Sequence, residues 1–248
     1  MMSPAKLGGT SKLELLLIDL RQRVIEVDSD LEPLFNIHAG EARFGASVIE
    51  SDLQHLSSGG KILEIGAGIL LLSCHLSREG YAVTAVEPSG RGFSHLDRLR
   101  KIILDYATER GFAPTLFKVP AEDLDFDSEF DFAFSISVME HVVDVDLVLR
   151  RVLSAIRMGG HYRFVCPNYL FPYEPHFNIP TLFSKALTER LFGKYIRSSQ
   201  SVVDPEGTWT SLNWISVSHV RRICCKELGA EPIFNRSVLY RRHSACAT

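Results

Sequence analysis

The sequence lacks the cysteine pattern of a disulfide-rich or zinc-binding protein. Its five cysteines are Cys74, Cys166, Cys224, Cys225 and Cys246. An odd count without any C-x-x-C pair argues against a disulfide framework and against a structural zinc site. We therefore expect reduced, mostly buried thiols, which are typical of proteins in a reducing compartment.

An excess of charge and a long hydrophobic run are also missing. The net charge is −3, and the basic residues are spread along the chain, so nothing favours nucleic acid as a partner. The apolar N-terminal run "LELLLIDLRQRV" is interrupted by Glu14, Asp19 and Arg21. It is too short and too charged for a membrane span, and we see no signal peptide. These features predict a soluble, cytoplasmic protein without membrane insertion.

What the sequence does contain is an alternation of strand-like and helical patterns. Five short apolar runs, rich in β-branched or aromatic residues, are "KILEIG" (61–66), "YAVTAVEP" (81–88), "APTLFKVP" (113–120), "FDFAFSISVM" (130–139) and "GHYRFVCP" (160–167). Segments with helical spacing lie between most of them, and "DVDLVLRRVLSAIRMGG" ends in two glycines. The pattern predicts an α/β fold with a doubly wound, mostly parallel sheet and helices on both faces.

The rest of the chain departs from this alternation. Residues 1–60 read as a helical cover, and 61–248 as the main domain. Within it, 168–213 form an insertion after the fifth strand, rich in prolines and aromatic residues, with one helix in "IPTLFSKALTERLFG". We expect "SVSHVRRICCKELG" to be another helix. The segment "EPIFNRSVLYRR" then supplies one or two last strands, giving seven in all.

The turn after the first predicted strand indicates which ligand the sheet binds. Gly66 and Gly68 follow the strand, but the sixth position of a G-x-G-x-x-G dinucleotide fingerprint is Leu71. Glu64 lies before the glycines, where a carboxylate would repel a pyrophosphate but suit a cation. Glu87, at the end of the second strand, is placed to accept hydrogen bonds from a ribose diol. A ligand with a ribose, a positive charge and no phosphate fits, and S-adenosylmethionine is such a molecule.

The motifs "LEIGAG", "AVEPS", "PAEDLDF" and "FDFAFSISVMEHVVD" resemble, in order and spacing, the class I S-adenosylmethionine-dependent methyltransferases over residues 60–167. The resemblance implies a Rossmann-like methyltransferase fold. It also implies that the cofactor is held by Glu64, Gly66, Ala67, Gly68, Glu87, Pro88, Ala121, Glu122, Ser135 and Ser137.

Two further points concern the same cofactor. Leu70 stands where many members of that family have a third alternate glycine. It is compatible with the fold if its side chain points into the core between helix and sheet. Arg43, in "NIHAGEARFGASV", is a further candidate cofactor ligand, because it could pair with the donor's carboxylate if that segment folds across the site.

Two clusters could carry chemistry. Glu140 and His141 follow the fourth strand, at the edge where open α/β sheets bind ligands. His141 could act as a base, orient the acceptor or cap a helix. Two adjacent ligands without an identified third partner do not predict a metal site.

The second cluster is "PNYLFPYEPHFNIP" (167–180), a loop that its four prolines make stiff. We expect it to wall the substrate pocket, with Tyr169, Tyr173, Glu174 and His176. A packing loop or a subunit contact is the alternative. His176 is the first choice for general base, because an unperturbed imidazole titrates near neutrality. Tyr173 is a second choice. Trp209 could complete the pocket, while core packing explains Trp214 equally well.

These observations predict an enzyme that transfers a methyl group from S-adenosylmethionine to a small-molecule acceptor, in particular a hydroxyl. A nicotinamide-dependent reductase is one alternative, although it predicts a third glycine and often a Tyr-x-x-x-Lys pair, and neither is present. A non-catalytic sensor or scaffold that binds the same cofactor is the other. Nothing in the sequence identifies the acceptor or an oligomeric state.

Overall fold

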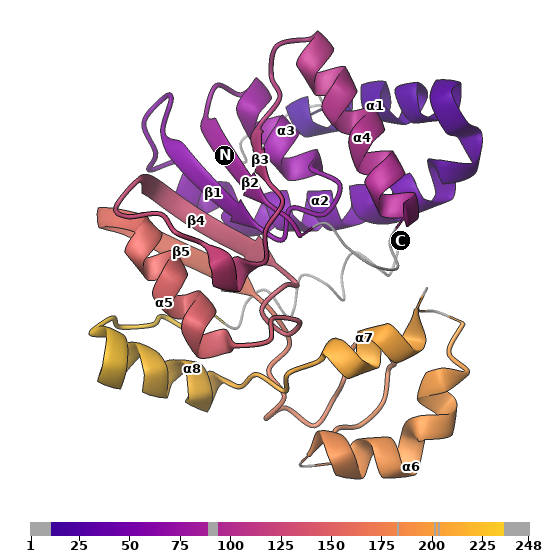
Figure 1. Cartoon of the computed structure of the whole chain (residues 1–248), viewed down its shortest axis with the longest axis vertical. Coiled ribbons are helices and arrows are strands. Elements are labelled where there is room, and N and C mark those ends of the chain that lie inside the picture. The colour runs from indigo at the N-terminus through magenta and orange to yellow at the C-terminus, as the bar shows by residue number, and fades with distance from the viewer. Residues whose placement is uncertain (1–10, 89–93, 183, 201, 203, 236–248) are drawn as a thin grey trace, which may run out of the picture. The chain divides into compact units, whose positions relative to one another are not determined.

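The computed structural model describes residues 11–88, 94–182, 184–200, 202 and 204–235 (Figure 1). The chain divides into two compact units, Met1–Val119 and Pro120–Thr248. Among the described residues, no helix is long and apolar enough to cross a membrane.

The first unit is a set of helices around three parallel strands. Its elements are α1 (Lys12–Asp28), η1 (Ser29–Leu31), α2 (Glu32–Leu53), β1 (Lys61–Ile65), α3 (Leu71–Arg78), β2 (Ala82–Val86), α4 (Ser94–Glu109) and β3 (Thr115–Phe117). β2 pairs in parallel with both β1 and β3. Parallel neighbours need a crossover connection, and α3 and α4 supply the two crossovers. The alternation predicted for residues 61–120 is confirmed.

The N-terminal helices belong to this first unit. Leu16, Leu20 and Val24 recur at helical spacing in α1 and are fully buried, so α1 presents one apolar stripe. That helix contacts α2, α3 and α4. The side chains of Ile62 and Leu63 in β1 are also fully buried, as expected of a strand covered on both faces.

The described residues of the second unit form two parallel strands and six helical segments. Its elements are η2 (Ala121–Asp123), β4 (Phe130–Ile136), α5 (Val145–Ala155), β5 (Ile156–Val165), α6 (Lys185–Arg197), α7 (Pro205–Ser211), α8 (Val217–Ile223) and η3 (Cys224–Leu228). α5 connects β4 to β5 and contacts both β5 and η2. α6 and α7 are orange in Figure 1, and α8 is yellow.

The start of β5 corrects the sequence prediction. The helix expected to run to Gly160 ends at Ala155, and the strand begins at Ile156. The pairing with β4 shifts register between Phe130 and Phe132. Gly159 has φ of +84°, and a Cβ on Gly160 would lie 2.7 Å from the carbonyl oxygen of Asp131. The two glycines, which look like a helix terminus in the sequence, permit an irregularity within the strand instead.

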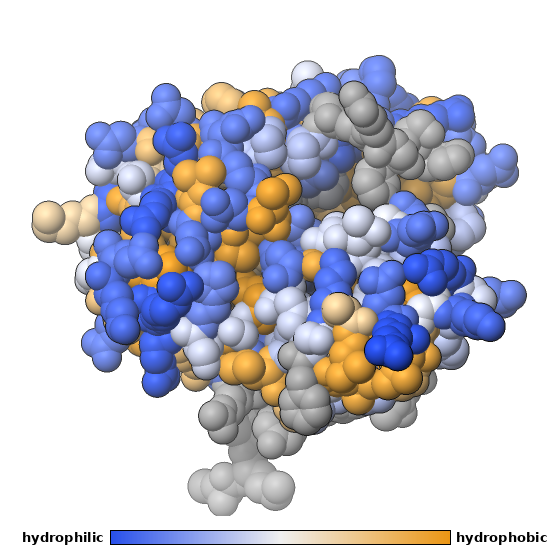
Figure 2. Space-filling model, turned by 60° about the horizontal axis from the view of Figure 1, so that its bottom comes forward, coloured by the Kyte–Doolittle hydropathy of each residue, from blue (hydrophilic) through white to orange (hydrophobic). Residues whose placement is uncertain are grey.

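The described residues contain five strands, whereas the sequence predicts seven. No strand occurs in 231–235, and the remainder of "EPIFNRSVLYRR" lies outside the described residues. On the surface shown in Figure 2, hydrophobic residues appear in patches among mostly hydrophilic ones. In α6, Leu187, Leu191 and Tyr195 are exposed.

Candidate functional site

The turn between β1 and α3 is built from left-handed backbone. Gly66, Gly68 and Leu70 have φ of 71°, 53° and 71°. The amides of Gly66 and Ala67 both donate to the carbonyl oxygen of Val86, at 2.8 and 3.1 Å. The left-handed backbone of Leu70 costs conformational free energy that a glycine would not incur. This explains why glycine would suit position 70. Its side chain is fully buried, so the expected inward orientation is confirmed.

The side chain of Glu87, directly after β2, stabilises this turn through hydrogen bonds. Its Oε2 accepts a hydrogen bond from the amide of Gly68 at 2.9 Å, and its Oε1 accepts one from Arg100 at 3.3 Å. Arg100 also donates to the carbonyl oxygen of Gly68 at 2.6 Å and to Asp97 at 3.0 Å. Burial raises the pKa of Glu87, while Gly68 and Arg100 oppose that shift. Sequence analysis missed Arg100, because its buried position follows only from the packing of α4.

Glu64 lies within β1 as a buried acid. Burial raises the pKa of Glu64 to about 8, and the charge of Glu87 adds to the shift, whereas a hydrogen bond from Ser73 opposes it. The side chain is therefore mostly protonated at neutral pH. This corrects the expectation of a ready-made anion at that position, because desolvation outweighs the hydrogen bonds from the side chain and the backbone of Ser73.

Arg43 has a partner within the first unit. Its guanidinium donates two hydrogen bonds to the carboxylate of Glu14, at 2.6 and 2.9 Å. The pair joins α2 to α1. The structure thus gives Arg43 a bond between helices, and its contact with a cofactor carboxylate stays a prediction.

In the second unit, three of the predicted cofactor residues lie in or between elements that they help to hold together. Ala121 and Glu122 lie in η2, and Glu122 Oε1 accepts hydrogen bonds from the amides of Val143 and Asp144 at 2.7 and 3.3 Å. Ser135 is fully buried and bonds to the hydroxyl of Tyr162 at 2.7 Å. These contacts hold the start of α5 and join β4 to β5.

Two more predicted cofactor residues lie at strand ends. Ser137 follows β4 with φ of 56°, and its amide donates to the carbonyl oxygen of Val165. Pro88 follows β2 in the first unit and is exposed. Their contact with the cofactor stays a prediction.

The loop 174–179 is closed around a buried carboxylate. The backbones of Glu174 and Ile179 form an isolated antiparallel bridge. The Glu174 side chain is fully buried and accepts hydrogen bonds from the amides of His176 and Phe177, at 3.1 and 2.8 Å. Its Oε1 also binds Nδ1 of His176 at 2.6 Å. Burial opposes ionisation, but the bonds from His176 prevail and hold the pKa of Glu174 below its usual value.

The side chain of His141 is also held through its Nδ1, in this case by a serine hydroxyl. Its Nδ1 lies 2.7 Å from Oγ of Ser211, whose hydroxyl donates to the carbonyl oxygen of Thr208 at 2.8 Å. A hydroxyl has one proton, so Ser211 accepts from His141 and Nδ1 carries the hydrogen. Burial, and then the charge of His176, lower the pKa of His141 to about 4. The ring is therefore neutral at pH 7, with its lone pair on Nε2.

The same reasoning fixes the tautomer of His176. An ionised Glu174 can only accept, so Nδ1 of His176 is the donor. In the neutral ring, the lone pair is on Nε2. The ring centroids of His141 and His176 lie 5.5 Å apart.

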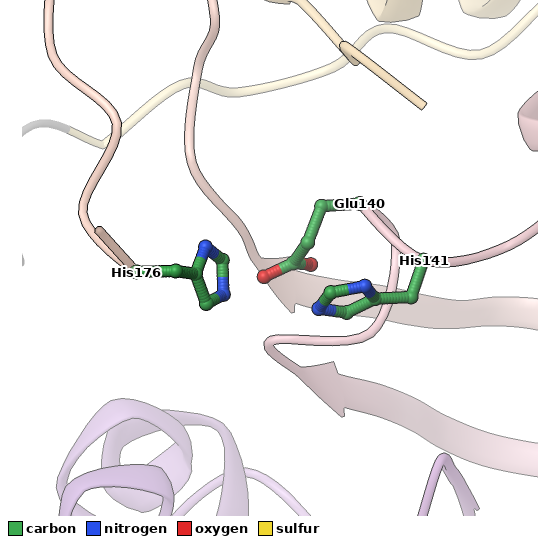
Figure 3. Close-up of side chains that lie close together, drawn as sticks. All are labelled: Glu140, His141 and His176. Atoms are coloured by element: carbon green, nitrogen blue, oxygen red, sulfur yellow. The ribbon is translucent and has the colours of Figure 1, made fainter. Parts of the chain in front are cut away.

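Glu140 completes this group. It is fully buried, and one ligand atom from each of Glu140, His141 and His176 lies within 4.8 Å of the others. Figure 3 shows both imidazole rings turned towards the Glu140 carboxylate. We call these three residues the Glu-His-His cluster. The sequence indicates the pair Glu140–His141 but not the third member, because His176 lies 35 positions after His141 in the chain.

Asn213 holds the turn that carries Glu140 and His141. Its side-chain amide donates to the carbonyl oxygens of Met139 and Val142 at 2.7 and 2.8 Å, and its backbone amide donates to the carbonyl oxygen of Glu140 at 2.8 Å. Three bonds from one residue thus fix the first two members of the cluster.

The expected substrate wall is partly a packed aromatic core. Tyr169 and Trp209 are each 4% exposed, and Tyr169 stacks on Trp214 with centroids 4.4 Å apart. Trp209 contacts Trp214 and Phe177 edge to face. The structure gives these rings a packing role behind the loop, and their contact with a substrate stays a prediction.

Tyr173 is the exposed aromatic residue of that loop. It is 42% exposed, and its hydroxyl donates to Oδ1 of Asn178 at 2.5 Å. The backbone of Asn178 is left-handed, with φ of 53°. The bond thus spans the loop that carries Glu174 and His176.

Comparison with known proteins identifies the family. A family model described as a methyltransferase domain matches residues 42–207, more than half of the 248 residues. The chain therefore belongs to the methyltransferase-domain family. This match confirms the resemblance to S-adenosylmethionine-dependent methyltransferases, a class of enzymes whose methyl donor is S-adenosylmethionine.

Individual relatives agree with this placement. An uncharacterized protein of Mycobacterium tuberculosis (strain ATCC 25618 / H37Rv) is 46% identical over 201 residues, 81% of this chain and 68% of that protein. A ubiquinone biosynthesis O-methyltransferase of Rickettsia bellii (strain OSU 85-389) is 29% identical over 100 residues, 40% of this chain and 39% of that protein.

A solved structure supports the fold. Phosphoethanolamine N-methyltransferase 2 of Haemonchus contortus, determined in complex with S-adenosyl-L-methionine, has a TM-score of 0.51. It is 18% identical, over 72% of this chain and 35% of that chain. The predicted α/β, Rossmann-like class is confirmed.

The buried acid of β1 generates a prediction about stability and pH. The pKa of Glu64 is raised on folding, so the unfolded chain releases this proton at lower pH than the folded chain does. Stability is therefore lost as pH rises from about 4.5 to about 8. Glu64→Gln cannot ionise and keeps an acceptor for Ser73. In urea unfolding it should gain stability over the wild type at pH 8.5, on the order of 2–5 kcal/mol, and little at pH 5.

Glu109→Gln serves as the control, since this exposed carboxylate pairs with Arg23 on the surface. It should change stability by less than about 1 kcal/mol at both pH values. An equal effect of Glu64→Gln at pH 5 and pH 8.5 would contradict the raised pKa.

Proposed function

We propose that this methyltransferase transfers the methyl group of S-adenosylmethionine to a hydroxyl of a small-molecule acceptor. The observation that carries the hydroxyl is the pair of fixed imidazole tautomers. His141 and His176 each use Nδ1 as a donor, so each neutral ring offers Nε2 as an acceptor. A hydroxyl must lose its proton to become a strong nucleophile, and an accepting nitrogen can take it.

The donor is assigned to the first unit. The glycine turn after β1 leads into the start of α3, and Glu87 supplies a carboxylate at the end of β2. We propose that Glu87 binds the ribose hydroxyls and that Glu64, Gly66, Ala67 and Gly68 surround the methionine portion. A bound ammonium group would favour the ionised form of Glu64, which offsets the cost of burying its charge.

The acceptor is assigned to the second unit. His176, held by Glu174, would receive the hydroxyl proton, as a base oriented by a carboxylate does in hydrolases. Exposed Tyr173 would contact the acceptor beside it. The similarity to ubiquinone biosynthesis O-methyltransferases over 100 residues supports oxygen as the acceptor atom. The contacts of Ala121, Glu122, Ser135 and Ser137 with the cofactor stay predictions.

Two alternatives predict different ligands. A reductase would bind NAD(P)H, and a sensor or scaffold would bind the cofactor without turnover. The family match favours the methyltransferase over the reductase. The Glu174–His176 pair favours an enzyme over a scaffold, because burying a carboxylate costs desolvation, and a buried carboxylate that orients an imidazole is typical of functional sites.

Loss of the ribose carboxylate should weaken donor binding. Glu87→Ala removes a charged acceptor, so the affinity for S-adenosylhomocysteine should fall by about 1.5–3 kcal/mol, which is roughly 10- to 150-fold. Isothermal titration of the full chain measures this directly. Asp97→Ala is the matched control, since Asp97 also pairs with Arg100 but has no proposed ligand. Equal affinity of Glu87→Ala and the wild type, or tight NAD(P)H binding, would contradict the assignment.

Loss of the proposed base should affect turnover alone. His176→Ala should lower kcat by about 10²- to 10⁴-fold and leave the dissociation constant of S-adenosylhomocysteine unchanged. The assay is transfer of a tritiated methyl group to a panel of hydroxylated acceptors. Wild-type turnover in this variant would show that His176 takes no part in the reaction.

A further inference from the structure

We propose that Glu140, His141 and His176 bind a divalent transition-metal cation, with Zn²⁺ as the best-fitting ion. The proposal rests on the function proposed above and deepens it, because the same cluster faces the acceptor. It gives His176 the role of a metal ligand, and the cation then activates the acceptor hydroxyl in place of a free imidazole base.

The donor set fits such an ion. Two imidazoles and one carboxylate are the ligands of several catalytic zinc sites, in which three protein side chains leave one position open for water or substrate. Imidazole favours zinc and its neighbours, whereas Mg²⁺ and Ca²⁺ prefer all-oxygen sites. The three ligand atoms lie within 4.8 Å of one another. Bonds of about 2.0–2.2 Å to a common ion would need only a small inward movement of the side chains.

The supporting hydrogen bonds match those of known metal sites. Metal-binding histidines usually donate their other ring nitrogen to a carboxylate, a carbonyl or water, which fixes the tautomer. Here Glu174 holds Nδ1 of His176 at 2.6 Å, and Ser211 holds Nδ1 of His141 at 2.7 Å. Both Nε2 lone pairs are thereby left for a ligand, next to a fully buried carboxylate.

The electrostatics point the same way. Two acceptor nitrogens and a carboxylate repel one another at close range unless a positive charge or a donor lies between them. The carboxyl group of Glu140 is fully buried, and the attraction between a carboxylate and a bound cation is strong in such a position. Asn213 donates two side-chain hydrogen bonds and one backbone hydrogen bond to carbonyl oxygens of the turn 139–142, so the backbone that carries two of the three ligands is held before the ion arrives.

The cation gives the methyl transfer a balanced path. The acceptor hydroxyl binds at the open position, where its pKa falls, and it releases its proton to solvent. The alkoxide or phenolate oxygen then forms a bond to the methyl carbon as the bond between carbon and sulfur breaks. The sulfonium becomes the neutral thioether S-adenosylhomocysteine. The overall change is one methyl group transferred and one proton released, without oxidation or reduction.

The test is metal binding by the full chain after treatment with a chelator. Titration with Co²⁺, followed by visible absorption, should show one equivalent bound with ligand-field bands, and Zn²⁺ should displace it. Mg²⁺ at the same concentration should not. Glu140→Gln, His141→Ala and His176→Ala should each weaken Co²⁺ binding at least 10-fold.

If a variant of a metal ligand fails to fold, a substitution at Glu174, which holds the ligand His176, provides a less disruptive test. Glu174→Gln keeps the size of the side chain but weakens the bond to Nδ1 of His176. It should weaken Co²⁺ binding about 10- to 100-fold. Folding of each variant is checked by circular dichroism and thermal melting.

His219→Ala is the matched control. His219 also pairs with a carboxylate, Asp146 at 2.6 Å, but it lies outside the cluster. Its loss should leave Co²⁺ affinity unchanged. Absence of Co²⁺ and Zn²⁺ binding, or binding that folded ligand variants retain, would overturn the proposal, as would equal weakening by His219→Ala.

The two proposals fail in different ways. Titration with S-adenosylhomocysteine in the presence of chelator tests the donor site without the metal. If the chain binds S-adenosylhomocysteine and methylates a hydroxyl but binds no cation, the metal site is wrong and His176 is the base. If it binds the cation through the cluster but not S-adenosylhomocysteine, the metal site stands and the proposed function is wrong.

Discussion

The hydrogen bond from Nδ1 of His176 to the buried carboxylate of Glu174 is the interaction on which the chemistry of the second unit depends. It fixes the ring's tautomer, anchors the loop 174–179 and offers Nε2 as an acceptor. His141 reaches the same state through the hydroxyl of Ser211. Whether the cluster receives a proton or a cation, these two bonds decide that both rings present lone pairs rather than hydrogens.

In the first unit, backbone conformation has the corresponding role. Three residues with positive φ between β1 and α3 turn the chain sharply, and Glu87 and Arg100 hold the turn from two other elements. The arrangement places backbone amides and a carboxylate together. We expect a phosphate-free adenosyl donor there, because the Glu87 carboxylate would repel a pyrophosphate.

The sequence predicted the strands and most helices because their hydrophobic periodicity is local. It also located the glycine turn, Glu87 and the Glu140–His141 pair, since each directly follows a strand. The prediction was wrong where one local pattern is compatible with two structures. Gly159 and Gly160 resemble the end of a helix in the sequence but lie within β5. The role of Arg100 could not be predicted for a different reason. Its hydrogen-bond partners Gly68, Glu87 and Asp97 come from three separate segments of the chain. The third member of the cluster needed a tertiary contact across 35 residues.

The central claim is that His141 and His176 are both Nδ1–H tautomers with acceptor Nε2 atoms. Long-range proton–nitrogen correlation spectra of the chelator-treated full chain, labelled with ¹⁵N-histidine and assigned with His→Ala variants, measure this directly at a pH where the rings are neutral. The account predicts a protonated Nδ1 and an unprotonated Nε2 for both residues. A protonated Nε2 on either neutral ring would contradict it.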